Sequence, residues 1–126
     1  MHIREAVEAD AGRLSELTGA PTDVMRNLVH DRTVRVAETD GEITGFVSFD
    51  ARDQTVHVTQ IEGSPAICAR LLEEPKRFAV GEGMAVELLV PDRKDDVQAA
   101  AADAGFDRVG PGPRFDDTAT VRYRLE

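Results

Sequence analysis

The sequence predicts a single α/β (α+β) domain, built as a mixed β-sheet with helices on both faces. Segments typical of strands alternate with amphipathic helical segments along the 126 residues, in the order βααβββαβαββ. Strands joined by tight turns pair antiparallel, whereas strands joined through a helix run parallel. This order therefore requires six or seven strands with both kinds of pairing. The sequence shows no internal repeat, linker or low-complexity tract, so we predict one domain over residues 1–126.

Hydrophobic spacing and turn residues define the elements of the first half. Leu14 and Leu17 are three residues apart, as on one face of a helix, and Pro21 suits the first turn of the next helix. Asp40-Gly41 is a strong signal for a two-residue β-hairpin. The predicted elements are a strand over His2–Ala6, helices over Ala9–Leu17 and Pro21–Asp31, and strands over Thr33–Thr39, Ile43–Phe49 and Thr55–Glu62.

The second half predicts two helices and three strands. The first helix starts at Ser64, and we expect Pro75 to end or kink it, with a short turn over Arg77–Val80, because proline lacks the N–H that a helix needs. The later elements are a strand over Met84–Val90, a helix over Pro91–Ala104, and strands around Arg108–Val109 and over Thr118–Leu125. A right-handed crossover places Met84–Val90 parallel to Thr55–Glu62. We expect the two helices on opposite faces of the sheet.

The charge of the chain excludes two classes of partner. The net charge is −9 with a pI near 4.8, which argues against binding nucleic acid or an anionic membrane surface. Only Lys76 and Lys94 are lysines, and the acidic residues are spread along the chain. Such a halophilic-type composition resembles cytosolic proteins of organisms that hold molar salt, where the Debye length is ~3 Å. An ordinary acidic protein from a GC-rich genome is the alternative.

Cysteine content and hydropathy indicate the compartment. The single cysteine, Cys68, cannot form an internal disulfide, which fits a reducing environment. The first residues form no apolar signal region, and no stretch is long enough to span a membrane. We therefore expect a cytoplasmic protein.

The most informative segment is the strand-to-helix junction within Val56–Leu72. The strand ends at Gly63-Ser64-Pro65 and a helix follows at once. The small residues allow close approach to the helix N-terminus, whose free N–H groups and positive dipole end suit a phosphate. The junction has no lysine, and its nearest arginine, Arg70, lies inside the helix. The segment therefore predicts an anion site without strong side-chain donors.

Three motifs carry a family resemblance that covers nearly the whole chain. They are the opening Ile3-Arg4-Glu5-Ala6 with Asp10-Ala11, the hairpin segment Asp40-Gly41-Glu42-Ile43-Thr44-Gly45-Phe46-Val47, and the helix Ala99–Phe106 that ends in Ala104-Gly105-Phe106. Together with the order of elements, they resemble the GNAT family of acyl-CoA-dependent N-acetyltransferases. The resemblance implies a GNAT-like mixed sheet.

The resemblance also implies an activity. It implies transfer of an acetyl group from acetyl-CoA to the amine of a small molecule or peptide, with Glu62 as the general base. The implied cofactor-binding residues are Ile61, Gly63, Ser64, Ala66 and Ile67. No metal is expected, because His2 and His30 have no suitable spacing with Asp, Glu or Cys. The acceptor amine and the oligomeric state stay open.

Two working parts of the family differ in this chain. The family's pyrophosphate loop has Arg or Gln, then Gly, then Gly or Ala, whereas alignment on the helix puts Gly63, Ala66 and Cys68 there. The connection is also about three residues shorter than the family's, and each Cβ holds the backbone away from a phosphate. The family's frequent tyrosine acid is replaced by Ala101, and the only tyrosine, Tyr123, is far along the chain. A non-catalytic GNAT-like binding module, with weak or no CoA binding, is therefore the alternative function.

Each candidate side chain also has a structural interpretation. Glu62 can be an exposed charge at a strand end, and Glu87 can pair with an arginine because it interrupts an apolar strand. His57 can lie on the surface of the sheet, although a role as base or proton shuttle is open. Cys68 can be a small buried helix residue or a thiol activated by the helix dipole.

Overall fold

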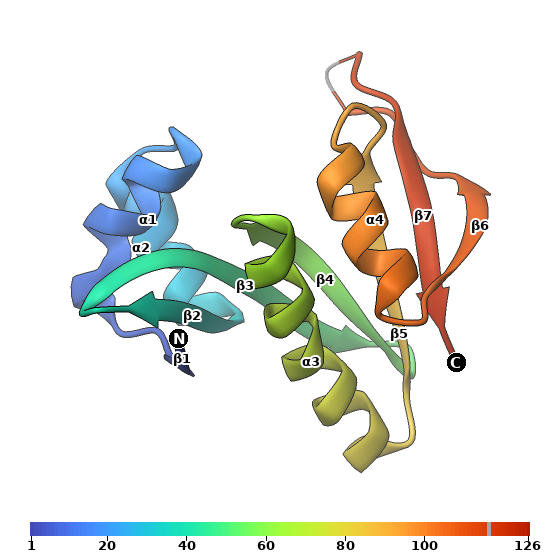
Figure 1. Cartoon of the computed structure of the whole chain (residues 1–126), viewed down its shortest axis with the longest axis horizontal. Coiled ribbons are helices and arrows are strands. Elements are labelled where there is room, and N and C mark those ends of the chain that lie inside the picture. The colour runs from blue at the N-terminus through green and yellow to red at the C-terminus, as the bar shows by residue number, and fades with distance from the viewer. Residues whose placement is uncertain (116) are drawn as a thin grey trace.

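The computed structural model describes residues 1–115 and 117–126, and these form seven strands, four α-helices and a short 3₁₀-helix (Figure 1). The strands are β1 His2–Glu5, β2 Thr33–Thr39, β3 Glu42–Arg52, β4 Thr55–Glu62, β5 Ala85–Pro91, β6 Asp107–Pro111 and β7 Thr120–Leu125. The helices are η1 Glu8–Asp10, α1 Ala11–Thr18, α2 Thr22–Asp31, α3 Pro65–Glu82 and α4 Asp95–Asp103. The predicted α/β class and mixed sheet are confirmed.

The strands form one sheet in the order β1-β2-β3-β4-β5-β7-β6. Each neighbouring pair is antiparallel except β4 and β5, which are parallel because the crossover helix α3 joins them. This confirms the predicted parallel pairing of Met84–Val90 with Thr55–Glu62, although β5 begins and ends one residue later than the predicted Met84–Val90.

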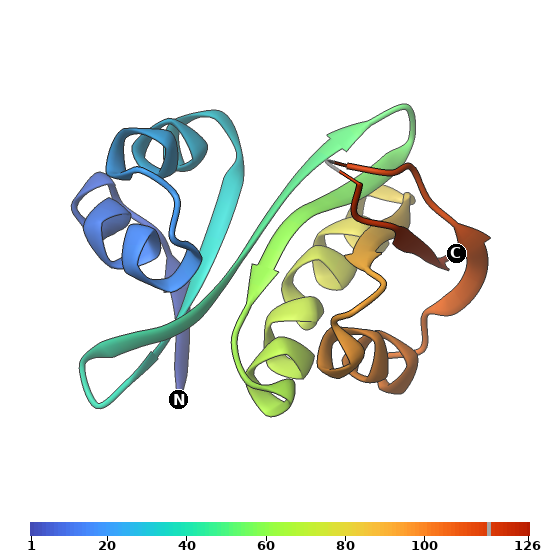
Figure 2. The same cartoon turned by 90° about the horizontal axis from the view of Figure 1, so that it is seen from above.

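Two helix pairs cover the two faces of the sheet (Figure 2). α1 and α2 pack together over one face, and α3 and α4 pack together over the other. Each pair closes its own hydrophobic core. The core under α1 and α2 includes Leu14, Met25, Val36 and Phe46, and the core under α3 and α4 includes Leu71, Leu72, Val86, Leu88, Ala100 and Ala101.

The predicted placement of α3 and α4 on opposite faces is therefore wrong. β6 lies outside β7 and runs parallel to β5, because both strands are antiparallel to β7. The crossovers β4–α3–β5 and β5–α4–β6 thus advance in the same direction along the sheet. Two right-handed crossovers in one direction place their helices on the same face.

α3 continues through Pro75 to Glu82, so the predicted helix end and the turn over Arg77–Val80 are also wrong. Proline inside a helix loses one hydrogen bond and crowds the preceding turn, at a cost of about 3 kcal/mol. Burial of Pro75 together with Leu71 and Ala79 offsets this cost. The helix ends at Gly83, whose left-handed φ of 68° supplies the usual helix stop.

An ion-pair cluster ties the start of the chain to the sheet. Arg4 in β1 donates two hydrogen bonds to Asp10, at 2.9 and 3.1 Å, and a third to Glu38 in β2 at 2.9 Å. Asp10 also accepts from the Val7 N–H at 2.8 Å. These bonds give the Arg4 and Asp10 of the opening motif a structural role.

In the described part of the chain, no helix combines the length and the apolar character needed to cross a membrane.

Candidate active site

β4 and β5 pair over four residues and then separate. The parallel register runs from Thr55 opposite Ala85 to Val58 opposite Leu88. Within the described residues, Thr59–Glu62 have no register partner on β5, while β5 stays paired with β7 as far as Pro91. Backbone groups of β4 that face this gap are therefore available to a ligand.

A bulge in β4 changes the direction of its side chains at the same place. The pairing with β3 skips Thr59, so that Ser48 lies opposite Gln60 and the next pair involves Val58. The Thr59 hydroxyl lies 2.7 Å from the Ser48 hydroxyl in a hydrogen bond. Val58 and Ile61 consequently share one core cluster, although residues three apart in a regular strand face opposite sides.

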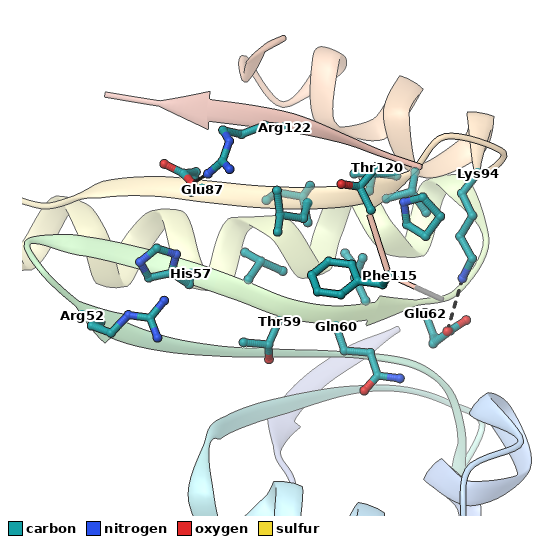
Figure 3. Close-up of a pocket in the computed structure, with 17 residues that line it drawn as sticks. Arg52, His57, Thr59, Gln60, Glu62, Glu87, Lys94, Phe115, Thr120 and Arg122 are labelled. Carbon is teal, nitrogen blue, oxygen red and sulfur yellow. Dashed lines mark hydrogen bonds and ion pairs between the residues drawn. The ribbon is translucent and has the colours of Figure 1, made fainter. Parts of the chain in front are cut away.

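A cavity of about 660 Å³ lies where the two strands separate (Figure 3). Its size suits a small-molecule ligand. Glu62 and Lys94 lie at one end of it, Phe115 from the segment after β6 lies in the middle, and Arg52, His57, Glu87 and Arg122 lie toward the other end. The cavity therefore combines an apolar centre with two charged ends.

Glu62, the predicted base, is placed at the end of β4 and beside a lysine. Its Oε1 lies 3.4 Å from Lys94 Nζ, and the two side chains are 26% and 37% exposed. A second cavity of about 450 Å³, lined by Gly63 and Arg93 among others, lies between the starts of α3 and α4. Glu62 and Lys94 line both cavities, so this pair stands between them.

The start of α3 is open to solvent on one side and closely packed on the other. Ser64 caps the helix by accepting a hydrogen bond from the Ile67 N–H at 3.4 Å. Ser64 and Ala66 are exposed, and within the described residues their N–H groups donate no hydrogen bond. The Ile67 side chain packs inward, and a Cβ built on Gly45 or Gly63 would lie 2.7 Å from its Cγ2. Exposed N–H donors at a helix start suit an anion.

Solved structures of acetyltransferases share this architecture. The structure superposes on an N-acetyltransferase from Staphylococcus aureus Mu50 with a TM-score of 0.82 and 16% identity, covering 99% of this chain and 97% of that one. It superposes on the ribosomal-protein-alanine N-acetyltransferase of Brucella melitensis with a TM-score of 0.80 and 18% identity, covering 98% of each chain. The chain has the GNAT acetyltransferase fold. At these identities the likeness establishes the fold alone.

A third GNAT-fold structure bears on the cofactor. The Salmonella typhimurium protein yncA, solved with its cofactor acetyl-CoA, matches with a TM-score of 0.78 and 19% identity over 99% of this chain and 92% of that one. Neither the protein-family models nor the curated protein sequences compared with this chain match it.

Ala101, at the position of the family's frequent tyrosine, and Tyr123, the chain's one tyrosine, both lie away from the cavity. Ala101 is buried in the core beneath α4. Tyr123 is 5% exposed in the same core, and its hydroxyl donates a hydrogen bond to Gln98 Oε1 at 3.0 Å. Tyr123 therefore cannot replace the tyrosine that is often the acid in the GNAT family without rearrangement of α4.

Cys68 is a buried thiol beneath the start of α3. Burial, together with the charge of Glu62, raises its pKa to about 11, although Lys94 opposes the shift. The thiol donates a 3.4 Å hydrogen bond to the Gly63 carbonyl. The interpretation of Cys68 as a small buried helix residue is therefore confirmed. A raised pKa is the opposite of what an activated thiol requires.

Glu87 is held in an ion pair, as its position in an apolar strand predicted. Arg122 and Arg124 both donate to its carboxylate, the second at 2.6 Å. Partial burial opposes ionisation, but the two arginines hold the pKa of Glu87 below its usual value. His57 lies opposite Glu87 in the parallel register and lines the cavity, so both interpretations of His57 stay open.

Sequence patterns did not identify three residues that line the cavity. Lys94 comes from the segment before α4, Phe115 follows β6, and Arg52 ends β3. Conversely Arg70, the expected nearest cation, lines a separate hollow beside the first residues of the chain. Among the described residues, no group of three or more His, Cys, Asp or Glu is placed to hold a metal ion.

Proposed function

We propose that this chain is an N-acetyltransferase that transfers the acetyl group of acetyl-CoA to the amine of a small molecule or peptide. The observation that carries the proposal is the separation of β4 from β5 after Val58 and Leu88, which leaves a cavity that shares its lining with a second one at the start of α3. In this chemistry the amine nitrogen bonds to the acetyl carbon, the carbon–sulfur bond breaks and CoA leaves as the thiol.

Main-chain groups would hold most of the cofactor. The N–H groups of the exposed residues Ser64 and Ala66, with the positive end of the α3 dipole, suit its pyrophosphate. Ile61 lines both cavities and Gly63 lines the second. The Ile67 N–H already donates a hydrogen bond to Ser64. Ile67 would therefore contribute by fixing the backbone beneath this site and would not bind the cofactor through its N–H. We regard this as a degenerate pyrophosphate loop, because no polar side chain replaces the family's Arg or Gln.

Lys94 supplies a cation that the loop lacks. Together with Arg93 it lines the second cavity, where Asp95 and Asp96 oppose it. These opposing charges favour weak binding. Lys94 can pair with an anion in the second cavity in place of Glu62, because it lines both cavities.

Glu62 would then accept the proton of the attacking amine, directly or through water. Release from Lys94 would leave the carboxylate free at the end of the cavity, beside the unpaired backbone of β4. N–H groups of that backbone would hold the thioester oxygen as negative charge develops on it. Positioning supplies the rest of the catalysis, which needs few specialised side chains.

The first test is calorimetric titration with acetyl-CoA. We expect affinity weaker than micromolar for the natural chain and further loss in Lys94→Met. Ala66→Gly should bind more tightly by allowing closer approach, and a bulky residue at Gly63 should abolish binding. Arg108→Gln is the matched control, because Arg108 is exposed on β6 and outside both cavities. Sub-micromolar binding by the natural chain would show that the loop is not degenerate.

The second test is release of free CoA thiol in the presence of a panel of amines. Glu62→Gln should lower kcat by about 100-fold at neutral pH, as expected for loss of a general base, and leave acetyl-CoA affinity unchanged or improved. Glu82→Gln, at the exposed end of α3, is the control. Absence of both binding and turnover would overturn the proposal.

A non-catalytic GNAT-like binding module is the second candidate. The Glu62–Lys94 ion pair favours it, because the carboxylate that would serve as base is already engaged. Acetyl-CoA binding without turnover on any amine would support this candidate. Equal turnover by Glu62→Gln and the natural chain would instead remove Glu62 from the mechanism and keep the enzyme.

A further inference from the structure

The described residues that line the larger cavity carry more positive than negative charge, in a strongly acidic protein. Among the described residues, the lining of this cavity contains three cations, Arg52, Lys94 and Arg122, against two carboxylates, Glu62 and Glu87. The chain as a whole carries a net charge of −9. A cationic cavity in such a chain is a local feature and does not follow from overall composition.

Both described carboxylates that line the cavity are engaged with cations. Glu62 pairs with Lys94, and Glu87 accepts hydrogen bonds from Arg122 and Arg124. The next carboxylate along the sheet is Asp50, which lies opposite His57 on β3 and pairs with Arg32.

Arg52 is the cation left over. Within the described residues it forms no hydrogen bond and no ion pair, and it lies with His57 and Arg122 at the end of the cavity away from Glu62 (Figure 3). A guanidinium with free donors in a half-enclosed site suits a carboxylate or phosphate.

The centre of the cavity is apolar. Phe115 lies across it and is 55% exposed, and Leu89 lines it from β5 beyond Glu87. An exposed aromatic ring over a pocket suits an alkyl or aromatic group beneath it.

We propose that the acceptor is a small primary amine joined through an apolar spacer to a carboxylate or phosphate, with the amine at Glu62 and the anion at Arg52. This proposal rests on the proposed acetyltransferase function, whose reaction sets the amine at the Glu62 end. His57 and Glu62 are five residues apart on β4, about 16 Å at 3.3 Å per residue. Side chains reach inward from both ends and shorten this span, so a spacer of several carbons should be preferred to a short one.

The test measures acetylation of ω-amino carboxylates with four, six and eight carbons, each beside its neutral carboxamide. Each pair has the same amine and the same spacer and differs only in the distal charge. We expect the longer acids to be acetylated with a KM about threefold to tenfold below that of their amides, as expected for one partly exposed charged hydrogen bond. Aminoalkyl phosphates, beside the corresponding amino alcohols, decide whether carboxylate or phosphate is the preferred anion.

Variants assign the preference to Arg52. Arg52→Gln should raise the KM of the acid to that of its amide, leave the amide unchanged and preserve kcat. Arg52→Glu should reverse the preference. Arg108→Gln removes the same charge from β6 and should change neither value.

The outcomes separate this proposal from the function on which it rests. Acetylation without an acid preference, or with a preference that survives Arg52→Gln, overturns the anionic acceptor and leaves the acetyltransferase intact. If no amine is acetylated, titration of the eight-carbon amino acid by calorimetry decides. Binding that is lost in Arg52→Gln supports the anion site without the activity, and equal binding of acid and amide overturns it.

Discussion

Gly45 is the position where one added methyl group should most clearly disturb both the fold and the candidate site. A Cβ built on Gly45 would lie 2.5 Å from the Glu62 carbonyl oxygen and 2.7 Å from Ile67 Cγ2. The Glu62 carbonyl belongs to the paired β3–β4 segment, where Phe46 lies opposite Glu62, so it cannot move as a flexible side chain can. The glycine of the hairpin motif is thus needed for close packing between β3, the end of β4 and α3.

The expected loss for Gly45→Ala follows from this clash. Overpacking a closely packed core costs about 1–3 kcal/mol, and contact with fixed backbone places the substitution in the upper part, at about 2–3 kcal/mol. For a domain of this size each kcal/mol corresponds to roughly 3–5 °C in Tm. We therefore expect a Tm lower by roughly 6–15 °C, and weaker acetyl-CoA binding below that temperature because Glu62 and Ile67 are displaced.

Thermal unfolding followed by circular dichroism measures this effect. Gly81→Ala is the control, because Gly81 lies in α3 with nothing within 4 Å of an added Cβ. It should raise stability by up to about 1 kcal/mol, as alanine does in a helix. In the pair Gly45→Ala with Ile67→Ala, the combined loss should be smaller than the sum by about 0.5 kcal/mol or more. A Tm for Gly45→Ala equal to or above that of the natural chain would refute the packing argument.

Three further predictions concern stability and reactivity. Asp10→Asn should cost about 1–3 kcal/mol at pH 7. Arg4, with the Val7 N–H, holds the pKa of Asp10 below its usual value, so this stabilisation is present at neutral pH and is lost as the pH falls below about 3.8. Urea unfolding should therefore show a smaller difference in unfolding free energy between the natural chain and Asp10→Asn at pH 3 than at pH 7. An equal difference at both pH values would contradict this. Cys68 should resist iodoacetamide at pH 7–8 in the folded chain and react on denaturation, because its pKa is raised to about 11; rapid modification of the native protein would disagree. The Tm should rise with KCl into the molar range, since screening reduces the repulsion of a −9 chain, and an equal or lower Tm would remove the high-salt interpretation.

The sequence predicted the elements best where side-chain pattern and turn chemistry agreed. β2 and β4 have the predicted bounds, Thr33–Thr39 and Thr55–Glu62, because β-branched residues fill both and Asp40-Gly41 sets the hairpin between β2 and β3. The continuation of α3 through Pro75 could not be predicted in this way. Local propensity opposes it, and only the buried surface around Leu71 and Ala79 makes it favourable.

The candidate site was predicted only in part. The family resemblance singled out Glu62, and the adjacency of strand end and helix start singled out Gly63; the structure places both at the lining of a cavity. Lys94, Phe115 and Arg52 come from three other segments, and only the separation of β4 from β5 brings them to one cavity. No local pattern marks a bulge at Thr59 or the position of β6 outside β7, because both depend on pairing between distant strands.

The altered loop therefore weighs less against catalysis than the sequence alone indicates. The family's pyrophosphate motif carries its cation on the loop before α3. The attraction between a cation and a bound anion depends only on their charges and distance, so the cation can come from another segment. The fold brings Lys94 to the same end of the cavity from the start of α4, and the gap in the sheet supplies backbone donors without any particular side chain. Under the proposed function, acyl transfer requires a positioned amine and donors aimed at the developing oxyanion. These would depend on how the strands diverge more than on which residues form the loop.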